Sequence, residues 1–232
     1  NISDPNSLII NSALAGTKRR IKFYVTQKQE CSSCYMPNTE FLSLFDGADR
    51  FDILQTLSIE VDTLTNQLNK NSITEVDFIK IDTQGSELDI LEGSLDFLSR
   101  AIGIEVEMEF VEVYKGQPLF DEVHSFLIRN GYNLFDLKRY YWKRKNEPPN
   151  TNKGQLIFGD GLYFRSPENI LSIEDIDEKK VIRSIYIYIA YGYYDLARNL
   201  YELSKKEDIF SSKSLLKLET IISKNKLNQA FP

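Results

Sequence analysis

The chain has 232 residues, of which 42% are hydrophobic, enough for one large α/β domain and an appendage. Its 28 basic and 34 acidic residues give a net charge of −6, which argues against nucleic acid as a partner. No apolar run approaches the roughly 20 residues of a membrane span, and no signal peptide is recognisable. We therefore expect a cytoplasmic protein without a membrane span.

The first 70 residues predict short strands on either side of an irregular segment. Apolar and β-branched residues cluster in runs of four to seven, which is typical of strands. The long stretch between them lacks a clear period and predicts a loop with a helical turn. In chain order, the expected elements are a strand at 8–14, a turn at 16–19, a strand at 21–25, the irregular segment 26–56, a strand at 58–61 and a helix capped by Asp62 or Thr63.

Two cysteines, Cys31 and Cys34, form a lone C-x-x-C pair. Such a pair suggests a redox site or half of a metal site. A structural zinc usually takes four Cys or His ligands, and His124 is the only histidine in the chain. We therefore interpret the cysteines as free thiols and expect no metal. His124 falls beside the apolar face of a predicted helix, where a structural role is expected.

The most informative stretch, residues 76–88, predicts a buried strand, a tight turn and the start of a helix. Its Phe-Ile-Lys-Ile run favours a strand that is covered on both faces. Gly85 permits the turn, and Ser86 with Asp89 matches a helix-capping box. Ligands of open α/β sheets bind beyond the carboxyl ends of strands, so Asp82 stands where chemistry is expected.

The rest of the chain predicts three more strands, with one helix between the first two, and then helices only. Residues 1–167 are expected to form the α/β domain, and residues 168–232 a helical extension with one helical hairpin at 189–201. In the α/β part the expected elements are a strand at 102–107, a helix at 120–130 ending at Gly131, a strand at 132–137, an insert at 138–158 and an antiparallel strand at 161–165.

The run Asp-Phe-Ile-Lys-Ile-Asp-Thr-Gln-Gly-Ser-Glu at 77–87 resembles the D-F-x-K-I-D-x-x-G-x-E signature of the FkbM-type methyltransferases. The resemblance implies a Rossmann-like class I methyltransferase sheet, with strand order 3-2-1-4-5-7-6, and S-adenosyl-L-methionine as cofactor. It extends over roughly residues 8–165. Weaker matches follow in the family's order at 11–14, 32–38, 104–107 and 131–132.

The largest departure from the family pattern concerns its glycine-rich cofactor loop, which would lie before Asn1. The sheet would then lack two central strands between those near Ile9 and Ile79. Such a gap exposes unpaired backbone groups. We therefore expect the native protein to carry a further strand–helix–strand–helix unit upstream of Asn1. An initiator codon directly before Asn1 would contradict this expectation.

The resemblance also implies site residues. It places Ser12 and Ala13 near the adenine, and Asp82 near the methionine part of the cofactor or the acceptor hydroxyl. An oxygen acceptor needs a group that takes its proton, and we expect Asp82 and Glu105 in this catalytic role, with Glu107 and Glu109 solvated. Residues 138–145 form a basic and aromatic run that could be a carbohydrate platform, a nucleic-acid contact or a solvated hairpin. The expected substrate-binding residues are Ser33, Tyr35, Asn38, Tyr141 and Trp142.

These features predict an O-methyltransferase that acts on a hydroxyl of a sugar, a glycan or another secondary metabolite. The alternative is a degenerate Rossmann-like binding module whose helical tail recruits a protein. The apolar stripe of the tail also leaves open a homo-oligomer.

Overall fold

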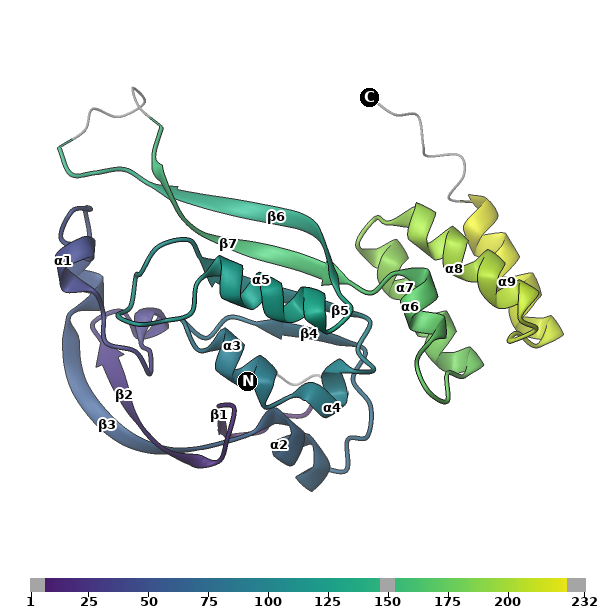
Figure 1. Ribbon diagram of the computed structural model, residues 1–232, viewed down its shortest axis with the longest axis horizontal. Helices are drawn as coiled ribbons and strands as arrows, with labels where there is room; N and C mark the ends of the chain where they lie inside the picture. The colour runs from purple at the N-terminus through teal and green to yellow at the C-terminus, as the bar shows by residue number, and fades with distance from the viewer. Residues whose placement is uncertain (1–6, 147–152, 225–232) are drawn as a thin grey trace.

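The computed structural model describes residues 7–146 and 153–224, which form two β-sheets with helices around them (Figure 1). The strands are β1 (Ala13–Leu14), β2 (Arg19–Thr26), β3 (Ile53–Asp62), β4 (Phe78–Ile81), β5 (Gly103–Glu109), β6 (Asn133–Trp142) and β7 (Gln155–Phe164). One sheet has the order β1-β3-β2 and the other β4-β5-β7-β6. In the second sheet β4 and β5 are parallel, and β7 is antiparallel to both of its neighbours. The expected α/β class is confirmed. The strand order of the second sheet is consistent with the 4-5-7-6 half of a Rossmann-like methyltransferase sheet.

Helices α3 and α5 cover one face of the second sheet (Figure 1). The apolar residues of β5, which are Ile104, Val106 and Met108, are at most 1% exposed beneath them. Side chains alternate across a strand, so the glutamates between these residues lie on the opposite face. The helices of this part are α1 (Thr39–Leu42), α2 (Leu64–Lys70), α3 (Glu87–Glu92), α4 (Leu95–Leu98) and α5 (Phe120–Arg129), with the short 3-10 helices η1 (Gln29–Cys31) and η2 (Ala48–Phe51).

The start of α3 differs from the expected capping box. The Ser86 hydroxyl donates to Thr83 Oγ1 at 3.0 Å and caps no helical N–H. Asp89 instead accepts from Arg19 at 2.6 Å. The sequence spacing correctly predicted the start of a helix, but Ser86 bonds to the preceding turn and Asp89 to the distant Arg19. The other cap prediction is confirmed, since the Thr63 hydroxyl accepts from the Asn66 N–H at 3.0 Å.

Strand lengths were the least accurate sequence expectation. The strand expected at 8–14 keeps only two residues, and β3 is ten residues long and begins inside the expected irregular segment. Residues 138–142 and 155–158 of the insert belong to β6 and β7, which pair as far as Trp142 and Gln155, while residues 147–152 lie outside the described part. These hairpins have one exposed face, so their apolar residues form no continuous run.

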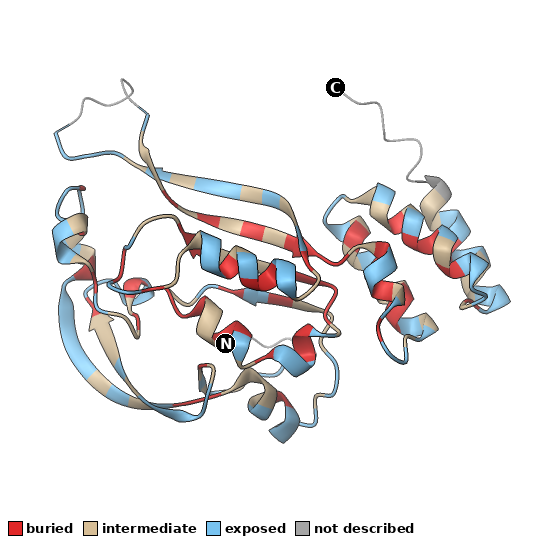
Figure 2. Ribbon diagram, viewed as in Figure 1, coloured by how far each residue is buried: buried red, intermediate tan, exposed pale blue. Residues whose placement is uncertain are grey.

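Four helices follow β7 and pack on one end of the second sheet: α6 (Pro167–Leu171), α7 (Glu178–Ala190), α8 (Tyr194–Lys206) and α9 (Ser212–Lys224). Buried residues concentrate along β5 and β7 and on the facing sides of α7 and α8 (Figure 2). Phe164 meets the rings of Tyr188, Tyr191 and Tyr193 at centroid distances of 5.4–5.5 Å. The expected helical hairpin is α7 and α8, which turn at Gly192 with φ +87°.

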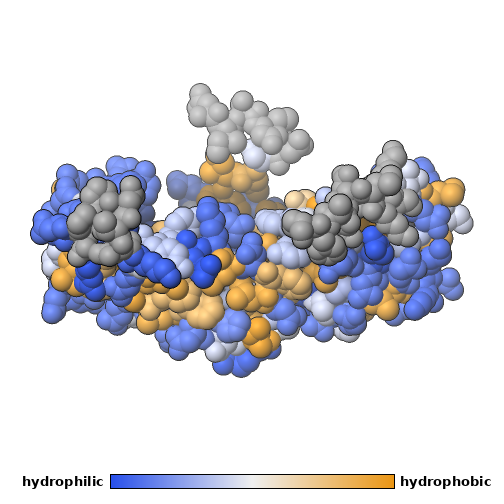
Figure 3. Space-filling view, turned by 90° about the horizontal axis from the view of Figure 1, so that it is seen from above, coloured by the Kyte–Doolittle hydropathy of each residue, from blue (hydrophilic) through white to orange (hydrophobic). Residues whose placement is uncertain are grey.

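The view from above shows hydrophobic residues near the middle of the molecule, between more hydrophilic ends (Figure 3).

Within residues 7–146 and 153–224, no helix has the length and apolar character that crossing a membrane requires. The boundary that we predict at residue 167 remains a prediction.

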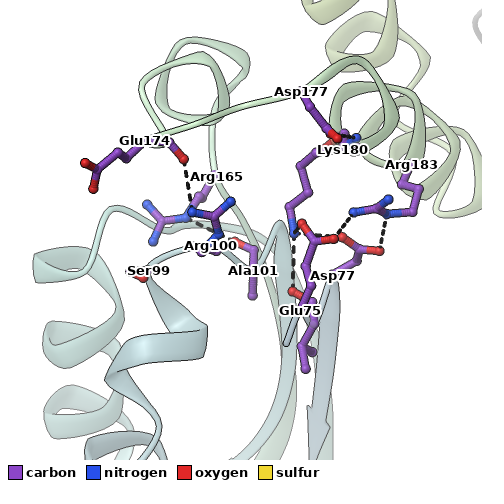
Figure 4. Close-up of polar contacts among 12 residues, drawn as sticks. Glu75, Asp77, Ser99, Arg100, Ala101, Arg165, Glu174, Asp177, Lys180 and Arg183 are labelled. Carbon is purple, nitrogen blue, oxygen red and sulfur yellow. Dashed lines mark hydrogen bonds and ion pairs between the residues drawn. The ribbon is translucent and has the colours of Figure 1, made fainter. Parts of the chain in front are cut away.

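An ion-pair cluster in which only Lys180 is buried holds α7 against the segment before β4 (Figure 4). Lys180, which is 1% exposed, donates to Asp77 at 2.7 Å and lies 3.2 Å from a Glu75 oxygen. Arg183 contacts the same two acids. Burial raises the pKa of Asp77, but hydrogen bonds from Lys180 and Arg183 outweigh it and hold the pKa below its usual value.

Replacing Lys180 with methionine should destabilise the protein by about 2–3 kcal/mol. The loss is smaller than for a fully buried pair because Asp77 keeps Arg183. Lys179→Met is the matched control, since Lys179 is exposed on the same turn of α7. Denaturant unfolding of both variants measures the difference, and equal stabilities would show that the cluster does not hold α7 in place.

Candidate functional site

The turn between β4 and α3 is held by a buried carboxylate. Glu87 is 3% exposed, and its side chain accepts the backbone N–H groups of Thr83 at 2.7 Å and Gly85 at 2.9 Å. Gln84 and Gly85 both have positive φ, +58° and +104°. A left-handed conformation is unfavourable for glutamine, so the surrounding hydrogen bonds must stabilise it. This turn therefore has a fixed shape at the carboxyl end of β4.

Gln84 connects the ends of two strands with a neighbouring loop. Its amide nitrogen donates to Asp82 at 3.1 Å and to Glu107 at 2.9 Å, and its amide oxygen accepts from the Tyr114 hydroxyl at 2.9 Å. The backbone oxygen of Gln84 accepts from the Ser33 hydroxyl at 2.6 Å. All the hydrogen-bonding groups of the amide except one acceptor site are thereby engaged, which fixes the side chain between Asp82 and Glu107.

The first cavity, of about 380 Å³, lies between the first sheet and the Asp82 turn. Its walls combine apolar side chains from β1–β3 with serine and threonine hydroxyls. The charged residues that line it are all acids: Glu30, Asp82 and Asp89. Its other lining residues are Ser12, Ala13, Leu14, Ala15, Ile21, Phe23, Ser32, Cys34, Ile59, Val61, Thr83, Gln84, Ser86 and Ile90.

The second cavity, of about 250 Å³, adjoins the first, because Glu30 and Gln84 line both. It combines two acids of β5, two cations and aromatic rings. Arg50 lies over the Trp142 ring at 4.7 Å from its centroid. The other residues that line it are Lys28, Cys31, Phe51, Glu107, Glu109, Val113 and Phe158.

The two β5 acids of the second cavity, Glu107 and Glu109, have strongly raised pKa values. Burial, together with the charges of Asp82 and Glu87, raises the pKa of Glu107 to about 8. Burial also raises the pKa of Glu109, and the neighbouring Glu87 and Glu107 add to this shift. Perturbed acids in a cleft are typical of functional sites. Glu107 is therefore near the point of losing its proton at neutral pH.

The structure brings together the three residues that were expected to bind the cofactor. Ser12, Ala13 and Asp82 all line the first cavity, although they come from β1 and from the end of β4. Trp142 lines the second cavity, but Tyr141 is 50% exposed and lines neither. Neighbouring strand residues point to opposite faces, which separates this expected pair.

Glu105, expected as a catalytic residue, lies away from both cavities. Its carboxylate accepts from Lys80 at 2.5 Å and from the Tyr191 hydroxyl of the C-terminal helices at 3.5 Å. It shares a face of β5 with Glu107 but stands two residues nearer to the start of the strand, where α7 covers the sheet. Glu107 is the β5 acid that shares the Gln84 amide with Asp82.

Three expected substrate-binding residues have structural partners and line neither cavity. Ser33 is buried and bonds to the Gln84 turn, and Asn38 accepts from Phe41 N–H as the N-cap of α1. The ring of Tyr35 packs near Gly85. Their contribution is to fix the loop that closes the second cavity, rather than to line it.

Sequence reasoning missed Gln84, and it expected Glu107 and Glu109 to be solvated, whereas Glu107 is half-buried and Glu109 is 3% exposed. The Ile-Glu-Val-Glu-Met-Glu alternation of β5 was a usable signal, because every second residue of a half-buried strand shares one face. The described residues hold no group of three or more His, Cys, Asp or Glu side chains arranged for a metal. His124 stacks on Phe120 and shares a hydrogen bond of 3.1 Å with the Tyr163 hydroxyl, in agreement with a structural role.

Comparison with known families decides the wider assignment. The Methyltransferase FkbM domain profile matches residues 2–134, more than half of the chain. The chain belongs to the FkbM methyltransferase family. The match includes the strands β1–β5 and the Asp82 turn, so this FkbM domain contributes most of both cavities and carries a methyltransferase function. No significant match was found among curated proteins or among solved structures.

The buried acids predict that this FkbM protein loses stability as the pH rises. The pKa of each of these acids is higher in the folded state than in the unfolded state. The contribution of such an acid to stability is therefore fully present below about pH 4.5, and it is lost as the pH rises through the folded-state pKa. We expect the free energy of unfolding to fall between about pH 5 and 8, and Glu109→Gln to flatten this fall. Glu112→Gln, at an exposed acid in the following loop, should keep the wild-type slope. Denaturant titrations across this range test the prediction, which an unchanged slope in Glu109→Gln would contradict.

Proposed function

We propose that this protein transfers a methyl group from S-adenosyl-L-methionine to a hydroxyl group of a sugar, a glycan or another secondary metabolite. The observation that carries the proposal is the pair of adjoining cavities that meet at Gln84. A methyl transfer needs two ligands aligned across a short gap, and two chambers with a common wall suit that requirement.

The first cavity fits the proposed cofactor by its chemistry. Glu30 and Asp82 supply negative charge for a ligand with a sulfonium and an ammonium group, while Asp89 is paired with Arg19. Apolar side chains of β2 and β3 supply a surface for a purine ring. Its volume of about 380 Å³ lies within the usual range for small-molecule sites. Ser12 and Ala13 are the residues that we assign to the adenine side.

The second cavity fits a hydroxylated acceptor. The Trp142 and Phe158 rings offer apolar surface for the faces of a sugar ring, while Glu107, Glu109 and the cation Lys28 offer polar partners for its hydroxyls. The cation–π contact with Arg50 holds the Trp142 ring in place. Of the aromatic residues in the run at 138–145, only Trp142 lines this cavity.

S-adenosylmethionine, when bound, supplies a methyl group on a positively charged sulfur. The Gln84 amide holds Oε1 of Glu107, which leaves Oε2 to take the proton of the acceptor hydroxyl. The bound cofactor would supply the methyl carbon to the acceptor oxygen and would keep the electron pair of the carbon–sulfur bond on sulfur, while Glu107 would hold the proton of the hydroxyl. Asp82 shares the Gln84 amide with Glu107, so the cofactor chamber and the base are positioned by one side chain.

Glu107→Gln should lower kcat/KM by about 10²–10³-fold, because the amide keeps the shape of the side chain but takes no proton. In the wild type, kcat/KM should rise with pH up to about 8, as Glu107 ionises, and then level off. The variant should lose this dependence and still bind S-adenosylmethionine.

Glu105→Gln is the matched control, since Glu105 is on the same strand and the same face but bonds to Lys80. It should leave kcat/KM and its pH profile near those of the wild type. The reverse result, a large loss in Glu105→Gln with little change in Glu107→Gln, would remove Glu107 from the proposed mechanism. Calorimetric titration with the cofactor and steady-state kinetics supply the two measurements.

Trp142→Ala should raise KM for the acceptor about tenfold or more, because it removes aromatic surface from the second cavity. Tyr141→Ala, at the exposed neighbour on β6, should change it by less than about twofold. Affinity for the cofactor should stay constant in both variants. Equal effects of the two substitutions on KM would argue that the acceptor binds outside the second cavity.

A further inference from the structure

A third hollow, of about 660 Å³, lies at the end of the second sheet that is opposite the two cavities, where β5 begins and β7 ends. It shares no lining residue with the first or second cavity. We call it the arginine hollow, because three arginines line it: Arg100 after α4, Arg129 at the end of α5 and Arg165 after β7. Nothing in the proposed methyl transfer uses it.

Positive charge in the arginine hollow exceeds negative charge. The one acid that lines it is Glu174, and no ion pair between this acid and the three arginines occurs among the described residues. Arg100 donates to the backbone oxygen of Glu174 at 3.0 Å. Figure 4 shows Arg100 with its bond to the backbone of Glu174, and Arg165 on the same side of the sheet. Guanidinium groups that line one hollow repel each other, and a bound anion would compensate this repulsion.

Arg165 is the most constrained of the three. It is 8% exposed, its Nε and one terminal nitrogen donate to the backbone oxygens of Ala101 and Leu98 at 3.0 and 2.8 Å, and its guanidinium lies 4.5 Å from the Tyr132 ring centroid. These partners are neutral. A buried cation without a carboxylate partner is costly, so an anionic ligand at this position would be favoured.

We propose that the arginine hollow binds a phosphate group. Guanidinium groups form paired hydrogen bonds with tetrahedral oxyanions, and two asparagine amides on the rim add neutral N–H donors for the remaining oxygens. Hydrogen bonds to backbone oxygens already fix the Arg165 side chain, so it loses little conformational entropy when a ligand binds. The phosphate is either free or carried on a larger molecule. Asn130 and Asn169 each donate one amide N–H to a backbone oxygen and keep the other, whereas the hydroxyls of Ser99 and Ser172 already donate to backbone oxygens.

Calorimetric titration with inorganic phosphate, at constant ionic strength and against sodium chloride, tests the proposal. We expect one saturable site, and a weakening of about tenfold in Arg129→Gln, because one charge-assisted hydrogen bond is lost. Arg129 is exposed, so the variant should fold normally. Arg139→Gln removes the same charge from exposed β6, outside the hollow, and should bind phosphate as the wild type does.

A second arm titrates glycerol 3-phosphate and adenosine diphosphate. Tighter binding of either than of inorganic phosphate would identify a phosphate carried on an organic molecule, and the reverse order a free ion. Absence of a saturable site, or equal weakening in Arg129→Gln and Arg139→Gln, would overturn the proposal. Binding is measured without the methyl-transfer reaction, so the result is independent of the proposed function.

Discussion

The buried carboxylate of Glu87 is the constraint on which the site depends. It accepts two backbone N–H groups of the turn after β4 and so stabilises a backbone that passes through positive φ at Gln84 and Gly85. Only in this conformation does the Gln84 amide reach both Asp82 and Glu107. One buried acid thus determines how the ends of β4 and β5 face the two cavities.

The same arrangement concentrates negative charge. Asp82, Glu87, Glu107 and Glu109 lie at the carboxyl ends of two adjacent strands, and burial of three of them keeps water from screening their repulsion. The raised pKa of Glu107 follows from this crowding. A group that destabilises the fold at neutral pH is thereby suited to accept a proton, which is a common relation between stability and function.

The C-terminal helices divide the second sheet into regions with different chemistry. Lys180 and Arg183 anchor α7 beside the start of β4, and tyrosines of α7 and of the following turn cover the rings of Phe78 and Phe164. This cover ends near Glu105, so that acid forms an ion pair with Lys80 while Glu107, two residues later, faces the second cavity. The arginine hollow lies at the opposite end of the sheet, between the sheet and these helices.

The sequence by itself determined the elements whose signal is local. The Phe-Ile-Lys-Ile run, the glycine after Gln84 and the family signature at 77–87 were enough for β4, its turn, the α/β class and the position of Asp82. Only the tertiary structure decided the partners of the acids. Glu105, Glu107 and Glu109 are indistinguishable along the strand, because each shares a face with the others and alternates with apolar residues. Which of them is paired with lysine and which is buried beside Asp82 depends on where α7 and the loop of residues 28–51 cover the sheet, and those contacts join residues that are far apart in the chain.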